Sequence, residues 1–316
     1  MKILILKTSS LGDIVHAFPI IQDIKKNFPE AEIDWVVEDI FKDLLIDIKD
    51  INQILISNFR NWKKTIFSPK SWVAFSKLRN TIKKNNYDVI IDCQGLLRTA
   101  LLVPFGSNSI GLDKNSIKEK FASLFYKKKV EVDKNQNAID RNRILASKAL
   151  GYIINDGNIE NAQPESKSID HKGPVIFFMG TSNDKKKWSA KNWIELCNWL
   201  HGAEKKVLLA WGSVKEYEEA MTIYENTKNS EILPRLKILE IKQLILKCSL
   251  AVGVDTGLTH LALFFGIPTI GIYCASDPIK TGLKSTKKGL FINFGDINNP
   301  PSFKTIKNYL ENTLEN

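Results

Sequence analysis

The sequence predicts an α/β protein of two domains, each with a parallel sheet covered by helices on both faces. The 316 residues are too many for one ordinary core, and two domains of about 150 residues each are the default. Short apolar runs alternate with helical patterns along the chain, which is typical of parallel sheets. The polar segment 155–174, which contains Pro and Gly, interrupts this alternation and separates a first domain, 1–155, from a second, 172–300.

The first half contains short apolar runs that predict buried strands. These strands are expected at residues 2–6, 32–37, 53–56 and 88–94. Apolar residues at helical spacing predict helices between and after them. These helices are expected at residues 13–27, 73–85, 117–126 and 136–150.

The second half repeats the same alternation. Its strands are expected at residues 174–179, 206–212, 250–254 and 269–273. Its helices are expected at residues 189–202, 214–227, 242–248, 258–265 and 302–316. Ser189 precedes the first of these helices and is a plausible N-cap.

Composition excludes several classes of protein. Apolar residues make up 43% of the chain and charged residues 25%, as in globular soluble proteins. No window of about eighteen consecutive apolar residues is present, so we expect no membrane-spanning helix. The apolar start, residues 2–6, is broken by Lys7, and no small-residue cleavage site follows. We therefore expect no signal peptide and a cytoplasmic protein.

Cysteine usage and charge narrow the expected ligands. Cys93, Cys197, Cys248 and Cys274 lie far apart and form no C-x-x-C or Cys/His cluster, so we expect neither a zinc site nor disulfides. The net charge of +10 favours an anionic partner, although a lysine-rich composition explains it equally well. No nucleic-acid-binding module is recognisable, so we expect no nucleic acid partner.

The stretch GVDTGLTH, residues 253–260, is the strongest candidate site because it links an expected strand to an expected helix. Asp255 ends the strand, Thr256 and Gly257 form a tight turn, and His260 lies about one turn into the helix. Free N–H groups at a helix N-terminus suit a phosphate, and Gly257 allows close backbone approach. The alternative is that Asp255 or Thr256 caps the helix and that His260 belongs to the core.

The stretch KTSSLGDIVH, residues 7–16, also follows an expected strand. Ser9, Ser10 and Gly12 make a compact turn, and Asp13 opens the next helix. Asp13 is either a capping residue or a carboxylate that acts as a general base. The stretch lacks both G-x-G-x-x-G and the G-K-[ST] of a P-loop, so it does not support ordinary NAD or Walker-type binding.

A third stretch, MGTSNDKKKW at residues 179–188, brings hydroxyls and cations to the end of a strand. Thr181 and Ser182 are hydrogen-bond donors, and Lys186 could neutralise a phosphate. The alternative is an exposed loop with solvated lysines, which is the usual state of a lysine run.

Weaker candidates lie in the first half. The stretches FRNWKK and KNSIKEK carry cations that could receive an acidic acceptor or be ordinary surface residues, namely Arg60, Lys63, Lys64 and Lys118. The stretch DCQGLLRT is another strand-end turn, in which we expect Asp92, Gln94 and Gly95 to face the ligand. His16, His171 and His201 show no partner pattern, and we interpret them as structural.

These stretches together resemble the ADP-heptose:lipopolysaccharide heptosyltransferases. KTSSLGD, DWVVE, DCQGLLRTALL, ASLFY, KKW, AWG and GVDTGLTHLA occur in the order of that family and span nearly the whole chain. Within the family, the chain resembles the type I enzymes. The type II enzymes are the near alternative, because their N-terminal turn usually departs from KTSS.

The resemblance implies a GT-B fold, in which two Rossmann-like domains face each other across a cleft. The second domain would bind an ADP-heptose donor and the first a Kdo-lipid A acceptor, while the terminal helix, 301–316, would pack back onto the first domain. The implied activity is the inverting transfer of heptose from ADP-L-glycero-D-manno-heptose to the Kdo of Kdo-lipid A, in the lipopolysaccharide inner core. The implied enzyme needs no metal or other cofactor and works in the cytoplasm, with peripheral association at the inner face of the inner membrane.

The resemblance also implies roles for residues at matching positions. Asp13 matches the catalytic base, and Lys186 would stabilise the leaving group. The donor-binding positions are Thr181, Ser182, Lys186, Glu216, Asp255, Thr256, Gly257 and His260. We expect the acceptor to contact Ser9, Ser10, Gly12, Arg60, Lys63, Lys64, Gln94 and Lys118. Ser182 keeps the hydroxyl of a family Thr, whereas Lys118 replaces a frequent Arg and loses its bidentate fork.

Three other interpretations are open. A sugar-nucleotide epimerase can share this architecture, but it would need further acid/base residues and no acceptor. A basic nucleic-acid-binding protein would interleave aromatic and basic residues on one surface, and its binding would fall steeply with salt. A two-domain solute-binding protein is disfavoured by the missing signal peptide.

Overall fold

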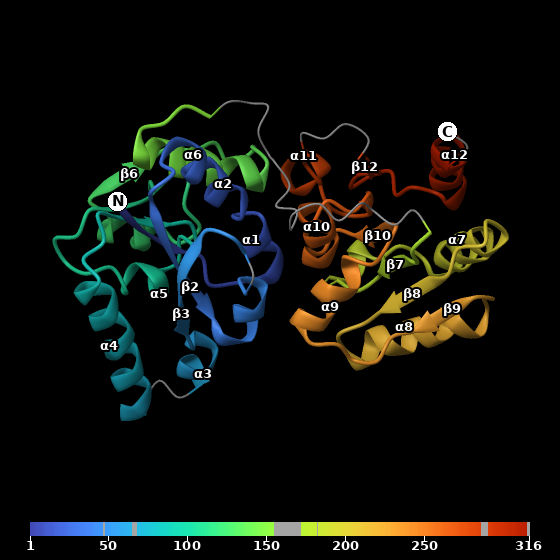
Figure 1. Ribbon diagram of the computed structural model, residues 1–316, viewed down its shortest axis with the longest axis horizontal. Coiled ribbons are helices and arrows are strands. Elements are labelled where there is room, and N and C mark those ends of the chain that lie inside the picture. Colours follow the sequence, from blue (N-terminus) through green and yellow to red (C-terminus); the bar gives the residue numbers. More distant parts are fainter. Residues whose placement is uncertain (47, 65–67, 155–171, 182, 286–289, 315–316) are drawn as a thin grey trace. The chain divides into compact units, whose positions relative to one another are not determined.

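The chain divides into two units, Met1–Ile159 and Glu160–Asn316. The structure, a computed structural model, describes residues 1–46, 48–64, 68–154, 172–181, 183–285 and 290–314, with the side chains of residues 63, 64, 313 and 314 left out. The expected interdomain connection, 155–174, lies almost entirely outside the described residues. Each unit has its own sheet and its own core, and each is described by itself (Figure 1).

The first unit is built on a six-stranded parallel sheet with the order β3-β2-β1-β4-β5-β6. Its strands are β1 (Lys2–Leu6), β2 (Glu32–Glu38), β3 (Ile51–Ser57), β4 (Val89–Asp92), β5 (Ser109–Leu112) and β6 (Lys128–Val130). Its helices are α1 (Leu11–Val15), α2 (Pro19–Asn27), η1 (Asp39–Leu44), α3 (Phe59–Lys64), α4 (Pro69–Lys84), α5 (Leu97–Ala100), η2 (Lys120–Phe125) and α6 (Ala138–Leu150). The central strand β1 pairs with β2 on one side and β4 on the other.

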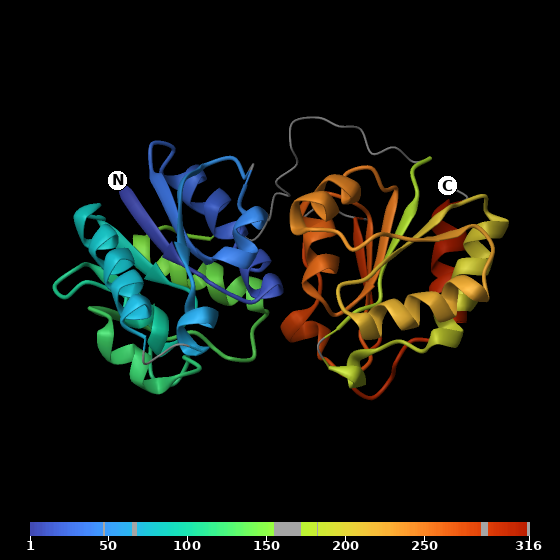
Figure 2. The same cartoon turned by 90° about the horizontal axis from the view of Figure 1, so that it is seen from below.

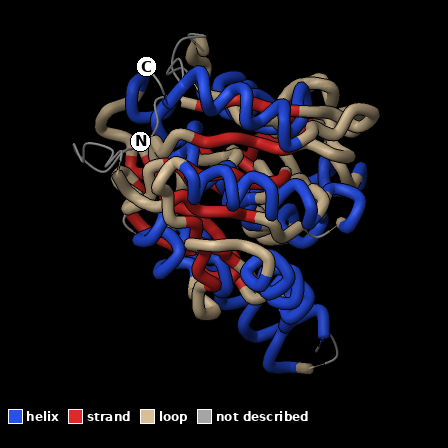
Figure 3. Tube along the Cα trace, turned by 90° about the vertical axis from the view of Figure 1, so that its right-hand side faces the viewer, coloured by secondary structure: helices blue, strands red, loops and turns tan. Residues whose placement is uncertain are grey.

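The central strands are apolar at successive positions because helices cover both faces of the sheet. In β1, residues 3–6 are fully buried. Figure 3 distinguishes the strands, in red, from the helices, in blue. On one face, α2 and α6 are joined by a buried ion pair, in which Arg143 donates to both carboxylate oxygens of Asp23 at 2.7 and 2.8 Å.

The second unit has the same architecture, with the sheet order β12-β11-β10-β7-β8-β9. Its strands are β7 (Val175–Phe178), β8 (Val207–Ala210), β9 (Ser230–Ile232), β10 (Leu250–Val254), β11 (Thr269–Ile272) and β12 (Phe291–Phe294). Its helices are η3 (Asp184–Lys186), α7 (Ala190–Gly202), α8 (Val214–Glu225), α9 (Ile238–Ile245), α10 (Gly257–Phe264), α11 (Pro278–Thr281) and α12 (Phe303–Leu314). Helices lie on both sides of this sheet (Figure 2). None of the helices in the described part of the chain is long and apolar enough to cross a membrane.

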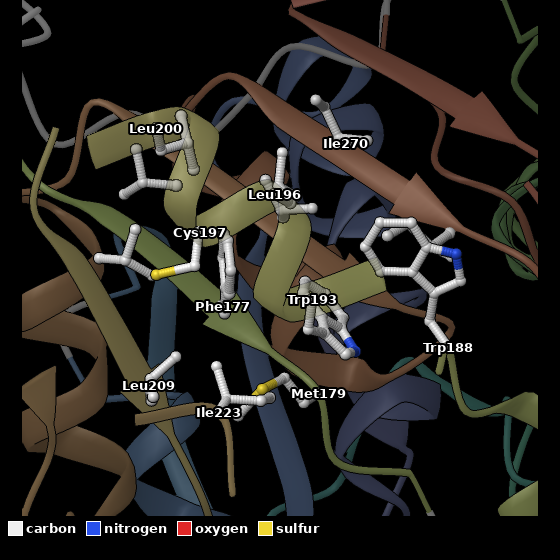
Figure 4. Close-up of a cluster of buried hydrophobic side chains, with 14 of the residues drawn as sticks. Phe177, Met179, Trp188, Trp193, Leu196, Cys197, Leu200, Leu209, Ile223 and Ile270 are labelled. Atoms are coloured by element: carbon white, nitrogen blue, oxygen red, sulfur yellow. The ribbon is translucent and has the colours of Figure 1, made fainter. Parts of the chain in front are cut away.

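Aromatic side chains fill the core between the second sheet and α7 (Figure 4). Phe177 of β7 packs on Trp193 of α7 with ring centroids 4.8 Å apart, and Trp188 meets Trp193 edge-on at 4.9 Å. The indole N–H of Trp188 donates to the carbonyl of Pro301 at 2.6 Å. This bond satisfies a buried polar group and ties the segment before α12 to the core.

Most of the expected strands and helices are confirmed, including the cap of α7, where the Ser189 hydroxyl accepts the N–H of Asn192 at 3.3 Å. The helix expected at 13–27 is divided into α1 and α2, because Pro19 suits the first position of a new helix. Part of the helix expected at 117–126 is the 3-10 helix η2. The expectations omitted β5, β6, β9 and β12. Charged residues interrupt the apolar pattern in β6 and β9.

The terminal helix packs on its own unit, where α12 contacts α7. The expectation that residues 301–316 also pack back onto the first domain stays a prediction. Ile306 and Leu310 are buried in the core of the second unit. The two residues are four positions apart and share one helical face. The sequence predicts this apolar face but not the domain on which it packs.

We expect Ile306→Ala to lower the free energy of unfolding by about 2–4 kcal/mol, because Ile306 is fully buried and its truncation leaves a cavity. Urea unfolding followed by tryptophan fluorescence and circular dichroism measures the change. Lys307→Ala is the matched control, since its partly exposed side chain contributes less than about 0.5 kcal/mol. Equal effects of the two variants would contradict the burial of this face of α12 in that core.

Candidate functional site

In the first unit, a side-chain amide holds the loop that follows β1. The Gln94 side-chain oxygen accepts the backbone N–H groups of Thr8 and Ser9 at 2.8 and 3.0 Å. The buried Lys7 ammonium donates to the carbonyl of Cys93 at 2.8 Å. These bonds join the ends of β1 and β4, which are neighbours in the sheet. Gln94, an expected acceptor contact, therefore positions the loop in this structure.

The Asp13 carboxylate lies in the first turn of α1, where its Oδ2 accepts both the backbone N–H and the hydroxyl of Ser10 at 2.9 Å. Partial desolvation acts to raise the pKa of Asp13. The positive charge of Lys7 and the two bonds from Ser10 outweigh this effect, so the pKa lies below its ordinary value. Asp13 is thus ionised at neutral pH while it remains exposed to solvent, and it can take a proton from a ligand.

Two charged residues that sequence reasoning missed, Arg98 and Glu38, lie beside this loop. Arg98 donates to the Ser9 hydroxyl at 2.7 Å and lies over the Phe59 ring, 5.5 Å from its centroid. Burial raises the pKa of Glu38, although the backbone N–H groups of Arg60 and Phe59 and the charges of Arg98 and Arg60 oppose it. This cluster brings Ser9 and Arg60, two expected acceptor contacts, to one edge of the sheet. Both residues lie in stretches that carry the family resemblance, Arg98 in DCQGLLRT and Glu38 in DWVVE, and this could have identified them as candidates.

Asp92 does not face a ligand, contrary to the expectation. It is fully buried and accepts the N–H groups of Gln94 and Gly95 at 2.8 and 3.0 Å and the hydroxyl of Tyr126 at 2.8 Å. Burial raises the pKa of Asp92. Its carboxyl group therefore shapes the turn after β4 from inside the protein.

The remaining expected acceptor contacts lie in α1, in α3 and in the loop before η2. Gly12 lies in the first turn of α1. Lys118 is exposed, and the next residue, Glu119, accepts the Leu97 N–H at 2.6 Å, so that the loop lies beside α5. The side chains of Lys63 and Lys64 are outside the part of the chain that the structure describes.

In the second unit, an ion pair joins the loop after β7 to the turn after β10. The Lys186 Nζ lies 2.6 Å from Oδ2 of Asp255, and the hydroxyl of Thr281 donates to the same oxygen at 3.2 Å. The Asp255 side chain is 7% exposed and that of Lys186 27%, so the carboxylate is enclosed while the ammonium stays accessible. Lys186 is therefore not a solvated loop lysine, whereas Lys185 beside it is exposed.

The surroundings of Asp255 keep its carboxylate ionised. Burial acts to raise the pKa of Asp255, but the proximity of His260 and the hydrogen bond and charge of Lys186 outweigh it, so the pKa lies far below its ordinary value. The His260 Nε2 lies 3.7 Å from Oδ1 of Asp255. The structure thus brings together three of the expected donor-binding residues, which come from two separate stretches of sequence.

The first turn of α10 adds backbone donors to this pair. Thr256 is the N-cap residue and Gly257 the first residue of the helix, but the Thr256 side chain makes no capping bond within the described chain. Thr259 instead turns inward and donates to the carbonyl of Val254 at 2.8 Å. The free N–H groups of this turn and the adjacent ammonium together form a place suited to an anion.

Glu216 and Thr181 flank the same side of the second sheet. The Glu216 carboxylate accepts the Gly212 N–H at 2.6 Å at the start of α8. A Cβ at Gly180 would lie 2.4 Å from the carboxyl carbon of Glu216, so glycine is what admits this carboxylate beside the loop after β7. Thr181 is half-buried in that loop, and Ser182 is outside the described residues.

Each unit therefore presents a different chemistry at the carboxyl ends of its strands. The first unit has an ionised carboxylate among hydroxyls, with arginines nearby. The second unit has a fixed ammonium beside a helix N-terminus. Among the described residues, no group of three or more His, Cys, Asp or Glu is arranged to hold a metal ion.

We expect Asp255→Asn to lower the free energy of unfolding by about 2–3 kcal/mol at neutral pH, because Lys186 loses its ionic partner. The pKa of Asp255 is lower in the folded than in the unfolded state. Its contribution is therefore complete above the unfolded value, about 4, and is lost as the pH falls toward the folded value.

Urea unfolding of the wild type and Asp255→Asn between about pH 7 and pH 3 measures this difference, which should narrow below about pH 4. Asp184→Asn is the control, because its carboxylate pairs with Lys187 and Lys215 at the surface and its loss should cost less. A difference between wild type and Asp255→Asn that stays constant over this range would refute the linkage.

Known proteins match this chain over most of its length. The sequence matches the glycosyltransferase family 9 (heptosyltransferase) over residues 75–311. Lipopolysaccharide heptosyltransferase 1 of Escherichia coli K12 is 32% identical over 284 residues, which cover 88% of this chain and 89% of that protein. Its counterpart in Pseudomonas aeruginosa PAO1 is 31% identical over 287 residues, which cover 89% and 81%.

A solved structure agrees with the sequence matches. E. coli heptosyltransferase WaaC with ADP has a TM-score of 0.85 and 28% identity to this chain, and the match covers 99% of both chains. It confirms the α/β architecture and the GT-B fold that the resemblance implies. With the family match extending over more than half of the chain, we conclude that this protein belongs to glycosyltransferase family 9, the heptosyltransferases.

Proposed function

We propose that this heptosyltransferase is of type I and moves heptose from ADP-L-glycero-D-manno-heptose to the Kdo of Kdo-lipid A, with inversion at the anomeric carbon. The observation that carries the proposal is the Lys186–Asp255 pair at the start of α10, which offers a diphosphate both a cation and free backbone N–H groups. The relative in E. coli is a lipopolysaccharide heptosyltransferase 1, and the similar solved structure binds ADP; both support the proposal.

On the donor side, Lys186 stabilises the departing diphosphate. Among the described residues, Asp255 occupies one of the three donors of the ammonium, which leaves the others for phosphate oxygens. Negative charge grows on the β-phosphate as its bond to heptose breaks, so a fixed ammonium and a helix N-terminus act most strongly in the transition state. The other donor contacts in this proposal are Thr181, Ser182, Glu216, Thr256, Gly257 and His260.

On the acceptor side, Asp13 is the general base. It takes the proton of a Kdo hydroxyl while that oxygen bonds to the anomeric carbon of heptose and the bond from this carbon to the diphosphate breaks. ADP leaves with the electron pair of the broken bond. Attack opposite the leaving group inverts the anomeric centre. The lowered pKa of Asp13 keeps the base ionised at neutral pH.

Cations near Asp13 suit an anionic acceptor, because Kdo carries a carboxylate and lipid A carries phosphates. Arginine offers these groups a planar pair of donors, whereas lysine offers a point charge. The acceptor contacts in this proposal are Ser9, Ser10, Gly12, Arg60, Lys63, Lys64, Gln94 and Lys118. Arg98 supports them by holding the hydroxyl of Ser9.

A type II heptosyltransferase that acts on heptosyl-Kdo-lipid A is the second candidate, because the same donor residues would serve it and only the acceptor would differ. Membership of glycosyltransferase family 9 disfavours the sugar-nucleotide epimerase, which would need no acceptor at all. The identity of the acceptor is therefore what an experiment has to decide.

We expect ADP release from ADP-heptose to require Kdo-lipid A and to fall by about 100- to 10,000-fold in Asp13→Asn, because the amide cannot take up the proton. A coupled ADP-release assay with each acceptor measures both effects. The side-chain oxygen of the introduced asparagine can still accept the bonds from Ser10, so the loop should keep its conformation.

Asp133→Asn is the matched control, since Asp133 is an exposed carboxylate of the same unit and accepts the Asn135 N–H at 2.9 Å. It should retain the wild-type rate. Release with heptosyl-Kdo-lipid A alone would assign the enzyme to type II. Near wild-type turnover by Asp13→Asn would remove Asp13 from the role of base.

We expect Lys186→Ala to lower kcat/KM for ADP-heptose by about 100- to 1,000-fold, because the leaving phosphate loses its fixed cation. Steady-state kinetics at varied donor concentration measure the loss, with thermal unfolding as a check on the fold. Lys185→Ala removes the neighbouring exposed ammonium and should leave donor kinetics unchanged. Unchanged donor KM and kcat in Lys186→Ala would rule out the proposed role of Lys186 in stabilising the leaving diphosphate.

A further inference from the structure

In the first unit, η2 exposes its large apolar residues and buries its small ones. Residues at i and i+3 of a 3-10 helix lie above one another, so Phe121 and Leu124 share one face. Their side chains are 75% and 70% exposed, whereas Ala122 and Ser123 between them are buried. Large apolar residues normally occupy the interior, and an exposed apolar patch on a globular protein marks an interaction site.

A second loop brings another aromatic residue to the same place. Phe105 stands beside Gly106, whose φ of 80° suits a tight turn, and its side chain is fully exposed. Phe105, Leu124 and Phe125 line one surface hollow of about 690 Å³. We call these residues together with Phe121 the apolar ridge.

Lysines flank the apolar ridge on both sides. Residues 118–129, KEKFASLFYKKK, contain five lysines and one glutamate. Lys120 precedes the ridge, and Lys127 follows it and lines the same hollow; both are exposed. The single glutamate, Glu119, accepts the backbone N–H of Leu97. The surface therefore combines protruding apolar side chains with an excess of positive charge.

We propose that the apolar ridge and its flanking lysines dock this protein on an anionic phospholipid bilayer. The aromatic and leucine side chains enter the interface between head groups and acyl chains, and the lysines stay at the level of the phosphates. The inference rests on the proposed function, because a lipid acceptor lies in a membrane. Lys118, an expected acceptor contact, lies three residues before Phe121, so docking would bring the acceptor-binding loop to the lipid surface.

Charge complementarity favours a bilayer over a second copy of this chain. In a two-fold dimer built on the ridge, the lysine-rich segment of one chain would face the same segment of the other. Like charges brought together in this way repel each other, whereas anionic head groups neutralise the lysines. The ridge is also a short row of protruding side chains from a loop and a 3-10 helix, which suits shallow insertion.

The test is sedimentation with vesicles of phosphatidylcholine, with and without phosphatidylglycerol. We expect the wild type to bind only the anionic vesicles, and the Phe121→Ser/Leu124→Ser double variant to bind them at least about tenfold more weakly. The matched control is Ile40→Ser/Ile153→Ser, which removes two exposed isoleucines of the same unit that are not part of the ridge and should bind like the wild type. Circular dichroism verifies that each variant is folded.

Lys120→Gln/Lys127→Gln supplies an independent variant of the same surface. It should weaken binding to anionic vesicles and flatten its dependence on salt, because fewer charges meet the head groups. Binding of Phe121→Ser/Leu124→Ser equal to that of the wild type would overturn the proposal. So would a wild-type dimer that this variant converts to monomers while vesicle binding stays the same.

Activity separates this inference from the proposed function. With an acyl-free, water-soluble form of the acceptor, Phe121→Ser/Leu124→Ser should turn over at the wild-type rate. With acceptor embedded in vesicles, its turnover should fall several-fold, and equal loss on both acceptors would contradict a docking role. If no variant released ADP with either acceptor, the proposed function would fail, while vesicle sedimentation would still decide the docking surface.

Discussion

The candidate donor site depends on the ion pair between Lys186 and Asp255. This contact joins the loop after β7 to the turn after β10, two strands that are neighbours in the second sheet. Loss of either partner would leave a charge in a partly buried place, which costs more than the pair itself contributes. The pair is therefore both a structural tie and a device that fixes one ammonium at the N-terminus of α10.

In the first unit, a neutral side-chain amide holds the loop after β1 in place. The Gln94 side-chain oxygen accepts two backbone N–H groups of the loop after β1, again between neighbouring strands. A neutral tie leaves the nearby Asp13 as the carboxylate at the start of α1, with its ionisation set by Lys7 and Ser10. This difference between the two units matches the proposed chemistry. A fixed cation stabilises a departing phosphate, whereas removal of a hydroxyl proton requires an accessible base.

Local sequence patterns predicted most of the strands and the turns that follow them, but not the partners of their side chains. The continuous apolar runs of β1 and β10 predict strands that are buried on both faces. The two lysines of β6 interrupt such a pattern, so the sequence does not predict that strand. Three successive lysines look alike in sequence, yet Lys186 meets Asp255 and Lys187 meets Glu219. Such pairings depend on contacts between distant parts of the chain, as does the choice of α7 as the neighbour of α12.

The segment 120–125 shows where a hydrophobic pattern misleads. Its apolar residues at i, i+3 and i+4 suggest an α-helix that turns this face inward, but the segment is a 3-10 helix in which Phe121 and Leu124 are exposed. Ala122 and Ser123 then face the protein, where their small side chains allow η2 to lie close against α5. The residues with the largest apolar surface are left outside, beside exposed lysines. Docking on a bilayer, as proposed, would bury them, and the positive charge around them favours an anionic membrane.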